Sequence, residues 1–136
     1  MTANAVLVVG MSALLSSWFT NQGVHSSWYQ SVKPTWTPPP RAFTIIWTML
    51  YASLAYSLSK TTMPAIHYIH LLCGALWCWQ FFVLEQACLS VATCVVIFIS
   101  AVVLCIGHPC VRWYLVPLVL WCGLALYMNV CSCHRR

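Results

Sequence analysis

Long apolar stretches, interrupted by isolated charged side chains, run along the whole chain. The charged residues leave five windows that contain no charge: 1–32, 42–59, 61–84, 86–111 and 113–134. An α-helix rises about 1.5 Å per residue, so even the shortest window would reach roughly 27 Å, close to a bilayer hydrocarbon core of about 30 Å. Each window is therefore long enough for one membrane span.

This pattern predicts an all-α fold, an integral membrane bundle of five transmembrane helices. The apolar part of the first window ends near residues 20–23, which leaves about twenty residues for the first helix. We expect a single domain over residues 1–136, with a loop over 21–41 and spans at about 4–20, 42–59, 65–83, 87–106 and 112–132.

A transmembrane β-barrel and a cleaved signal peptide both fit the apolar pattern less well. Continuous apolar runs such as residues 95–99 exclude the barrel, whose strands alternate polar and apolar side chains. The N-terminal stretch has neither a basic region nor a small-x-small cleavage site, which favours a retained first span over a signal peptide. With 62% hydrophobic and 5% charged residues, the composition also excludes a soluble domain and a disordered chain.

The basic residues favour one orientation of the bundle. Five spans place the two termini on opposite sides of the membrane. The side with the 21–41 loop and the C-terminus carries Lys33, Arg41, Arg135 and Arg136, whereas the other side carries Lys60 and Arg112. The positive-inside rule then puts the first loop and the C-terminus in the cytosol. The net charge of +5 forms no basic stripe, so we expect no nucleic-acid partner.

Cysteine and histidine are the candidate metal-ligating residues. Cysteines inside the apolar windows are expected to behave as small hydrophobes, namely Cys73, Cys78, Cys88, Cys94, Cys105 and Cys122. The segment 131–134, Cys-Ser-Cys-His, has no second ligand pair at zinc-like spacing and fits an acylation site equally well, so no metal is predicted. His67 and His70 share one helix face and either link helices by hydrogen bonds or belong to a pocket.

Tryptophan is unusually abundant, with 8 residues in the chain. An aromatic belt at the membrane surfaces accounts for those near span ends, such as Trp18 and Trp113, but not for Trp47, Trp77 and Trp121 within the windows. An indole inside a bundle offers a flat apolar face and one N–H donor. Such groups suit a large planar or rigid apolar ligand.

The segment 28–51 combines aromatic side chains with prolines at 34, 38, 39 and 40. Because proline fixes φ and lacks an N–H donor, we expect this loop to be stiff and non-helical, with the next helix able to begin at Pro40. A rigid loop of this kind serves either as a lid over a cavity between helices or as a plain connector. Composition leaves both roles open.

The same segment resembles the signature of the TspO/MBR family, also known as translocator proteins, tryptophan-rich sensory proteins or peripheral-type benzodiazepine receptors. The matching positions are Trp28, Tyr29, Lys33, Pro34, Trp36, Pro38, Pro39, Trp47, Leu50 and Tyr51. Further matches are Leu71, Trp77, Phe81 and Phe82 in the third span, and Pro117, Trp121 and Asn129 in the fifth. Three family positions differ, because His70 replaces a glutamine, Gly74 an asparagine and Leu118 a tyrosine.

The resemblance implies a bundle that binds tetrapyrroles such as protoporphyrin and haem, cholesterol-like sterols and synthetic benzodiazepine-site ligands, for sensing, sequestration or transport. Carried over by position, the ligand-binding residues are Tyr29, Trp47, Trp77 and Trp121 in the pocket walls, Trp36, Pro38 and Pro39 in the lid, and Asn129 as a polar contact. His70 is expected to take over part of the role of the missing amide at Gly74, and it is a candidate haem ligand.

The resemblance also bears on partners and location. It implies a lipid bilayer as the environment, a tetrapyrrole as ligand with no required cofactor, and a homodimer as a plausible assembly. The membrane would be the mitochondrial outer membrane in a eukaryote and the cell membrane in a bacterium.

An enzyme is the main alternative, because Trp47 and Trp121 match the two indoles connected with proposed light-dependent porphyrin breakdown in bacterial relatives. Glu85 is the only acid, and the chain has no paired carboxylates, nucleophile triad or metal cluster, so hydrolysis is excluded. The enzymatic alternative is therefore limited to photo-oxidative or other cofactor-free redox chemistry.

A transporter or channel would show midplane charges and inverted repeats, and the sequence has neither. We therefore expect a binding protein.

Overall fold

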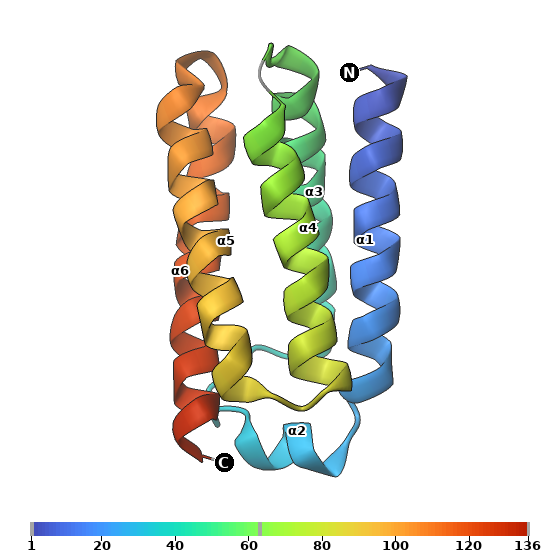
Figure 1. Ribbon diagram of the computed structural model, residues 1–136, viewed down its shortest axis with the longest axis vertical. Helices are drawn as coiled ribbons and strands as arrows, with labels where there is room; N and C mark the ends of the chain where they lie inside the picture. Colours follow the sequence, from blue (N-terminus) through green and yellow to red (C-terminus); the bar gives the residue numbers. More distant parts are fainter. Residues whose placement is uncertain (1, 63, 136) are drawn as a thin grey trace.

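The computed structural model describes residues 2–62 and 64–135, so Arg136, counted above for orientation, lies outside the described residues. Within that range five helices are long and apolar enough to cross a membrane (Figure 1). They are α1 (Ala3–Gly23), α3 (Pro40–Lys60), α4 (Ala65–Cys78) continued by the π-helical turn η1 (Trp79–Val83), α5 (Ala87–Gly107), and α6 (Arg112–Arg135) preceded by the 3-10 turn η2 (Pro109–Val111). The prediction of an all-α, five-helix membrane bundle is confirmed.

The five long helices form a ring in which each helix contacts two neighbours, in the order α1, α3, α6, α5 and α4. The short helix α2 (Ser27–Val32) lies across the end of the bundle where the C-terminus is found, which we call the lid end (Figure 1). The N-terminus and the α3–α4 and α5–α6 connections lie at the opposite, far end. This order places α3 beside α6, although the two helices are far apart in the sequence.

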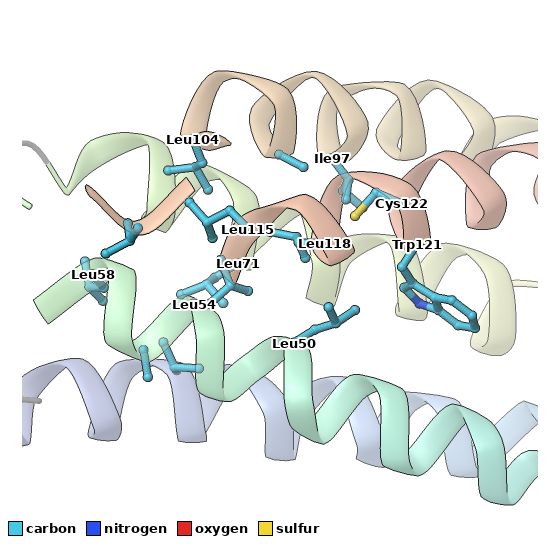
Figure 2. Close-up of a cluster of buried hydrophobic side chains, with 14 of the residues drawn as sticks. Leu50, Leu54, Leu58, Leu71, Ile97, Leu104, Leu115, Leu118, Trp121 and Cys122 are labelled. Atoms are coloured by element: carbon cyan, nitrogen blue, oxygen red, sulfur yellow. The ribbon is translucent and has the colours of Figure 1, made fainter. Parts of the chain in front are cut away.

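The centre of the ring is filled by leucines and small residues. Leu54, Leu104, Leu115 and Leu118 are almost completely buried, and they come from three different helices (Figure 2). Large apolar side chains such as Leu72 point outward, where a soluble protein would carry charge. Because lipid is as apolar as the core, helix association in such a bundle depends on close packing and on hydrogen bonds rather than on the hydrophobic effect.

The loop between α1 and α3 differs from the expectation of a non-helical segment, because it contains α2. Ser26 begins this helix, and its side-chain oxygen accepts a hydrogen bond from the Tyr29 backbone N–H at 3.1 Å. The helix stops at Val32 because Pro34 forces the preceding Lys33 into extended backbone, with ψ at 142°. α3 begins at Pro40, as predicted, since a proline in the first turn loses no hydrogen bond.

The turn between the third and fourth spans is unusually tight. The π-helical turn η1 is followed by Glu85, which adopts a left-handed φ of 56°. Gly23, at the end of α1, approaches η1 so closely that a Cβ atom at this position would collide with the Phe82 backbone carbonyl. The absence of a side chain at Gly23 therefore allows α1 and η1 to meet at the lid end.

The expectation for the cysteines is wrong at one position. Cys88, in the first turn of α5, forms a disulfide with Cys133, near the end of α6. The two residues are 45 positions apart, and they meet because α5 and α6 are antiparallel neighbours whose lid ends coincide. The pairing also removes the Cys133 thiol from any metal site at 131–134. The buried Cys78, Cys94 and Cys122 are free, as expected for small hydrophobes.

Candidate ligand-binding site

Aromatic side chains gather in two places within the bundle. The lid cluster lies where α2 meets the third span, and it consists of Trp28, Tyr29, Trp77, Phe81 and Phe82. The central pair consists of Trp47 on α3 and Trp121 on α6. The structure therefore divides the four expected wall residues of the pocket into two groups, with Tyr29 and Trp77 in the lid cluster and Trp47 and Trp121 in the central pair.

The lid cluster is closely packed. Trp77 stacks on Phe81 with ring centroids 5.3 Å apart and an interplanar angle of 18°. Trp28 and Tyr29, from α2, meet the Phe81 ring edge-on at 5.4 and 6.1 Å. Burial raises the pKa of Tyr29 above its ordinary value, because the charged phenolate is disfavoured away from water. α2 is thus held against the bundle by aromatic contacts.

Asn129, expected to be a polar contact for a ligand, has protein partners for both ends of its amide. Its Oδ1 accepts a hydrogen bond from Trp77 Nε1 at 2.8 Å, and its Nδ2 donates to the Ala87 carbonyl at 2.9 Å. Ser90 Oγ completes the group at 3.1 Å from Nδ2. Asn129 is 1% exposed, so this network joins α4, α5 and α6 inside the bundle.

The central pair is arranged differently. The Trp47 and Trp121 rings meet edge to face with centroids 6.3 Å apart, and Phe43 contacts Trp121 at 5.3 Å. Trp121 is only 8% exposed, yet its Nε1 has no hydrogen-bond partner among the described residues. A buried N–H left without an acceptor costs about 1–3 kcal/mol. Because the Nε1 atom is itself buried, the part of Trp121 that lines a neighbouring cavity is its apolar ring and not its N–H.

An open apolar groove adjoins Trp121 along the seam between α3 and α6. Its volume is about 340 Å³, and it is lined by Ile46, Met49, Leu50, Pro117, Leu120, Trp121 and Leu124. Figure 2 shows Trp121 at the edge of the leucine core, with Leu50 opposite it on α3. Met49 and Leu120 are 65% and 69% exposed, so the groove opens on the lipid-facing side of the bundle.

The lid loop contacts the last part of α6. Trp36 stacks on Tyr127 with centroids 5.6 Å apart and an interplanar angle of 19°. Arg135 donates a hydrogen bond from Nη1 to the Lys33 carbonyl at 3.2 Å. Pro38 and Pro39 lead from Trp36 into the first turn of α3. The expected lid residues therefore sit between the start of α3 and the end of α6.

The two histidines of the third span make hydrogen bonds between helices, which is the first of the two roles considered for them. His70 Nδ1 lies 2.7 Å from Ser100 Oγ on α5, and His67 Nε2 lies 2.8 Å from Ser57 Oγ on α3. Both histidines are buried. His70 belongs to neither aromatic group.

Three contributors to this region were not predicted from the sequence. Ser90 completes the Asn129 network, Tyr127 stacks on the lid, and Arg135 holds the lid backbone. The partners in these contacts are distant in the chain, with Arg135 bonded to a residue 102 positions earlier. No local sequence pattern marks such contacts, because they depend on which helices are neighbours in the ring.

Comparison with known proteins agrees with this architecture. The chain is similar to Protein CrtK of Rhodobacter capsulatus, with 25% identity over 119 residues that cover 76% of this chain and 74% of that protein. The model of the TspO/MBR family matches residues 4–134. Because this match covers almost the whole sequence and includes nearly all of the five spans, the chain belongs to the TspO/MBR family.

Proposed function

We propose that this membrane protein binds a tetrapyrrole, protoporphyrin or haem, against the central pair, and that it senses, sequesters or passes on the bound molecule. Sterols are a second ligand class that the family resemblance implies. The ligand is cargo, and the protein needs no resident cofactor for this role.

The observation that carries the proposal is the state of Trp121. Its indole is buried beside a second indole and a phenylalanine, and its N–H has no partner among the described residues. The Nε1 atom is itself buried, so a ligand in the adjoining groove would contact the apolar ring of Trp121 and not this N–H. Flat aromatic surfaces at right angles also favour a large planar ligand.

The test is titration of purified protein with protoporphyrin, followed by tryptophan fluorescence and by the porphyrin absorption band. We expect Trp47→Ala combined with Trp121→Ala to weaken binding at least tenfold, because both ring faces are lost. The matched control combines Trp18→Ala with Trp113→Ala, which removes two exposed indoles of the same chain. Unchanged affinity in the central double variant, with the thermal unfolding temperature preserved, would contradict the proposal.

Two further arms of the same experiment define the ligand and the outcome. Competition by cholesterol tests whether sterols share the site. Illumination of the protoporphyrin complex, compared with a dark sample by product analysis, separates a binding protein from a photo-oxidative enzyme acting through Trp47 and Trp121. Intact porphyrin after illumination favours binding alone.

Direct iron ligation by His70 is a separate part of the proposal for haem. Because Nδ1 is hydrogen-bonded to Ser100, ligation would use Nε2. Haem absorption spectra of His70→Ala that match those of the parent would remove His70 as an iron ligand while leaving tetrapyrrole binding in place.

A further inference from the structure

We propose that the Cys88–Cys133 disulfide is a redox-sensitive latch on the lid. A water-soluble thiol reduces it at the lid end, and the last turn of α6 and the α2 segment that it contacts then loosen together. The latch involves only bonds within this chain, so it does not depend on which molecule the protein binds.

The disulfide lies at the end of the bundle that carries α2 and the C-terminus (Figure 1). Cys88 is in the first turn of α5 and Cys133 is in the last turn of α6, and both residues are half-buried. The free Cys78, Cys94 and Cys122, by contrast, are buried. The S–S bond is therefore placed where a thiol dissolved in water can reach it.

Charge favours a reducing compartment on this side of the membrane. Lys33, Arg41 and Arg135 belong to the lid end, which also carries Glu85, the only acid of the chain. The positive-inside rule predicts that this end faces the cytosol, where disulfides are usually transient and redox-sensing because glutathione reduces them. Glutathione is an anionic thiol, so the excess of basic residues also attracts it.

The last turn of α6 holds the lid at two points. Cys133 packs against the lid cluster. Arg135, two residues further on, donates a hydrogen bond to the carbonyl of Lys33, the residue that directly follows α2, at 3.2 Å. A covalent bond at Cys133 therefore restrains the same segment that contacts α2 and its C-terminal end.

Reduction would leave the rest of the bundle joined. Asn129, one turn before Cys133, has hydrogen bonds to α5 that involve neither sulfur. Cys88 Sγ lies 3.6 Å from the Cys133 carbonyl oxygen, so after reduction its thiol can donate a weak hydrogen bond there. The loosening is therefore expected in residues 130–135 and in the lid segment that they contact, and not in the bundle as a whole.

The reaction is thiol–disulfide exchange with a glutathione-class thiol as reductant. Its thiolate attacks one sulfur of the Cys88–Cys133 bond, which forms a mixed disulfide and releases the other cysteine as a thiolate. A second thiolate of the reductant breaks the mixed disulfide. Two electrons thus pass to the protein, the two cysteine sulfurs take up protons from water, and the reductant leaves as its own disulfide. Exchange with that oxidised form runs the same steps backwards, so the latch is reversible.

Cys131 provides a matched control at the same end of α6. It is free and half-buried, and it lies two positions before Cys133. Side chains two residues apart on a helix do not face each other, so Cys131 is directed away from the Cys133 sulfur. Substitution of Cys131 should therefore leave the latch intact.

The experiment uses the full chain in phosphatidylcholine nanodiscs and compares amide hydrogen exchange, measured by mass spectrometry, before and after reduction with glutathione. The α2 amides report on the lid, because the Gln30 and Lys33 N–H groups are hydrogen-bonded to the Ser26 and Tyr29 carbonyls. We expect these amides and those of residues 130–135 to exchange about tenfold faster after reduction, and residues 52–60 at the far end of α3 to change by less than about twofold.

Three variants remove or keep the latch without a change of reductant. Cys88→Ser and Cys133→Ser should each show the fast lid exchange of the reduced parent and no response to glutathione. Cys131→Ser should match the parent in both states. Thermal unfolding of each variant checks that the bundle is folded, and reduction of the parent gives the same comparison with no substitution at all.

Several outcomes would overturn the latch. Equal lid exchange in the oxidised and reduced parent would show that the disulfide does not restrain α2. A disulfide that glutathione leaves intact, with no newly alkylated thiol at Cys88 or Cys133, would be a permanent structural bond. Faster exchange throughout the bundle would show that the bond holds the fold rather than the lid. No ligand is added in these measurements, so their outcome is separate from that of the protoporphyrin titration.

Discussion

Trp77 and Trp121 are two indoles in the same bundle, and they differ in what their N–H groups meet. Trp77 donates to Asn129 at 2.8 Å and lies in a cluster closed by α2. Trp121 has no partner for its N–H among the described residues and borders a groove open to lipid. Residue type alone therefore does not distinguish a tryptophan that holds helices together from one that is available to a ligand.

The polar network accounts for the difference in physical terms. In a bilayer each buried polar group must be satisfied from within the protein, because no water is present. Asn129 accepts a hydrogen bond from the Trp77 N–H, and its own hydrogen bonds to Ala87 and Ser90 join α6 to α5. The cluster around Trp77 is expected to be rigid, whereas the Trp121 N–H is buried without a partner among the described residues and stabilises no helix contact.

The largest expected effect tests how tightly the lid cluster is closed. Gly23→Ala should lower the free energy of unfolding by about 3 kcal/mol, because the new Cβ meets the Phe82 backbone, which cannot rotate away. Thermal unfolding in detergent measures this change. Gly74→Ala is the matched control, since nothing lies within 4 Å of its Cβ position, and it should be neutral or stabilising. Equal unfolding temperatures for the two variants would contradict the close approach.

The next effect concerns the network itself. Asn129→Leu should lower the free energy of unfolding by about 2 kcal/mol, because the Trp77 N–H is left inside the bundle without an acceptor. The exposed Asn21→Leu is the control and should change the unfolding temperature little. If Asn129→Leu unfolds at the parent temperature, the amide contributes nothing to stability and is free to serve a ligand.

Two matched substitutions separate the contributions of the Trp77 and Trp121 N–H groups to stability and to ligand affinity. Trp77→Phe and Trp121→Phe remove similar ring area, but only the first breaks a hydrogen bond. Trp77→Phe should therefore be less stable by about 1 kcal/mol than Trp121→Phe. Ligand titration should give the reverse order, with the larger loss of protoporphyrin affinity in Trp121→Phe. The same order in both measurements would remove the distinction between the two sites.

The smallest effect concerns the tight turn that supports the lid cluster. Glu85 has a left-handed φ of 56°, which glycine adopts without steric cost. Glu85→Gly should raise the free energy of unfolding by about 0.5–1 kcal/mol and leave ligand affinity unchanged. Glu85→Ala, which keeps a Cβ, should give no such gain. A destabilised glycine variant would show that the carboxylate is needed in the turn.

Several features of the fold could be predicted from the sequence because they depend on local physics. The positions of seven charges define five apolar windows, and Pro40 marks the start of α3. The helix α2 was not predicted because prolines dominate the composition of its loop, although all of them follow Val32 and leave residues 27–32 free to form helical hydrogen bonds.

The candidate site could be predicted only in part. The family resemblance points to Trp47, Trp77 and Trp121, but nothing in a linear pattern tells which indole is hydrogen-bonded. The Cys88–Cys133 disulfide was not predicted for a similar reason, since Cys88 lies in an apolar window, Cys133 belongs to the segment 131–134, and the two are 45 positions apart. Interhelical partners depend on the order of helices around the ring, and the windows do not encode that order.

The sequence by itself determined that lipid is the solvent, that five helices cross it, and that aromatic residues concentrate around one proline-rich loop. These properties follow from hydropathy, helix length and the rigidity of proline, each of which acts over a few residues. Only the tertiary structure decided that Asn129 is hydrogen-bonded to Trp77, that Cys88 forms a disulfide with Cys133, and that Trp121 lies beside an open groove. Such contacts arise from side chains on helices distant in sequence, whose positions are fixed when the whole ring packs together.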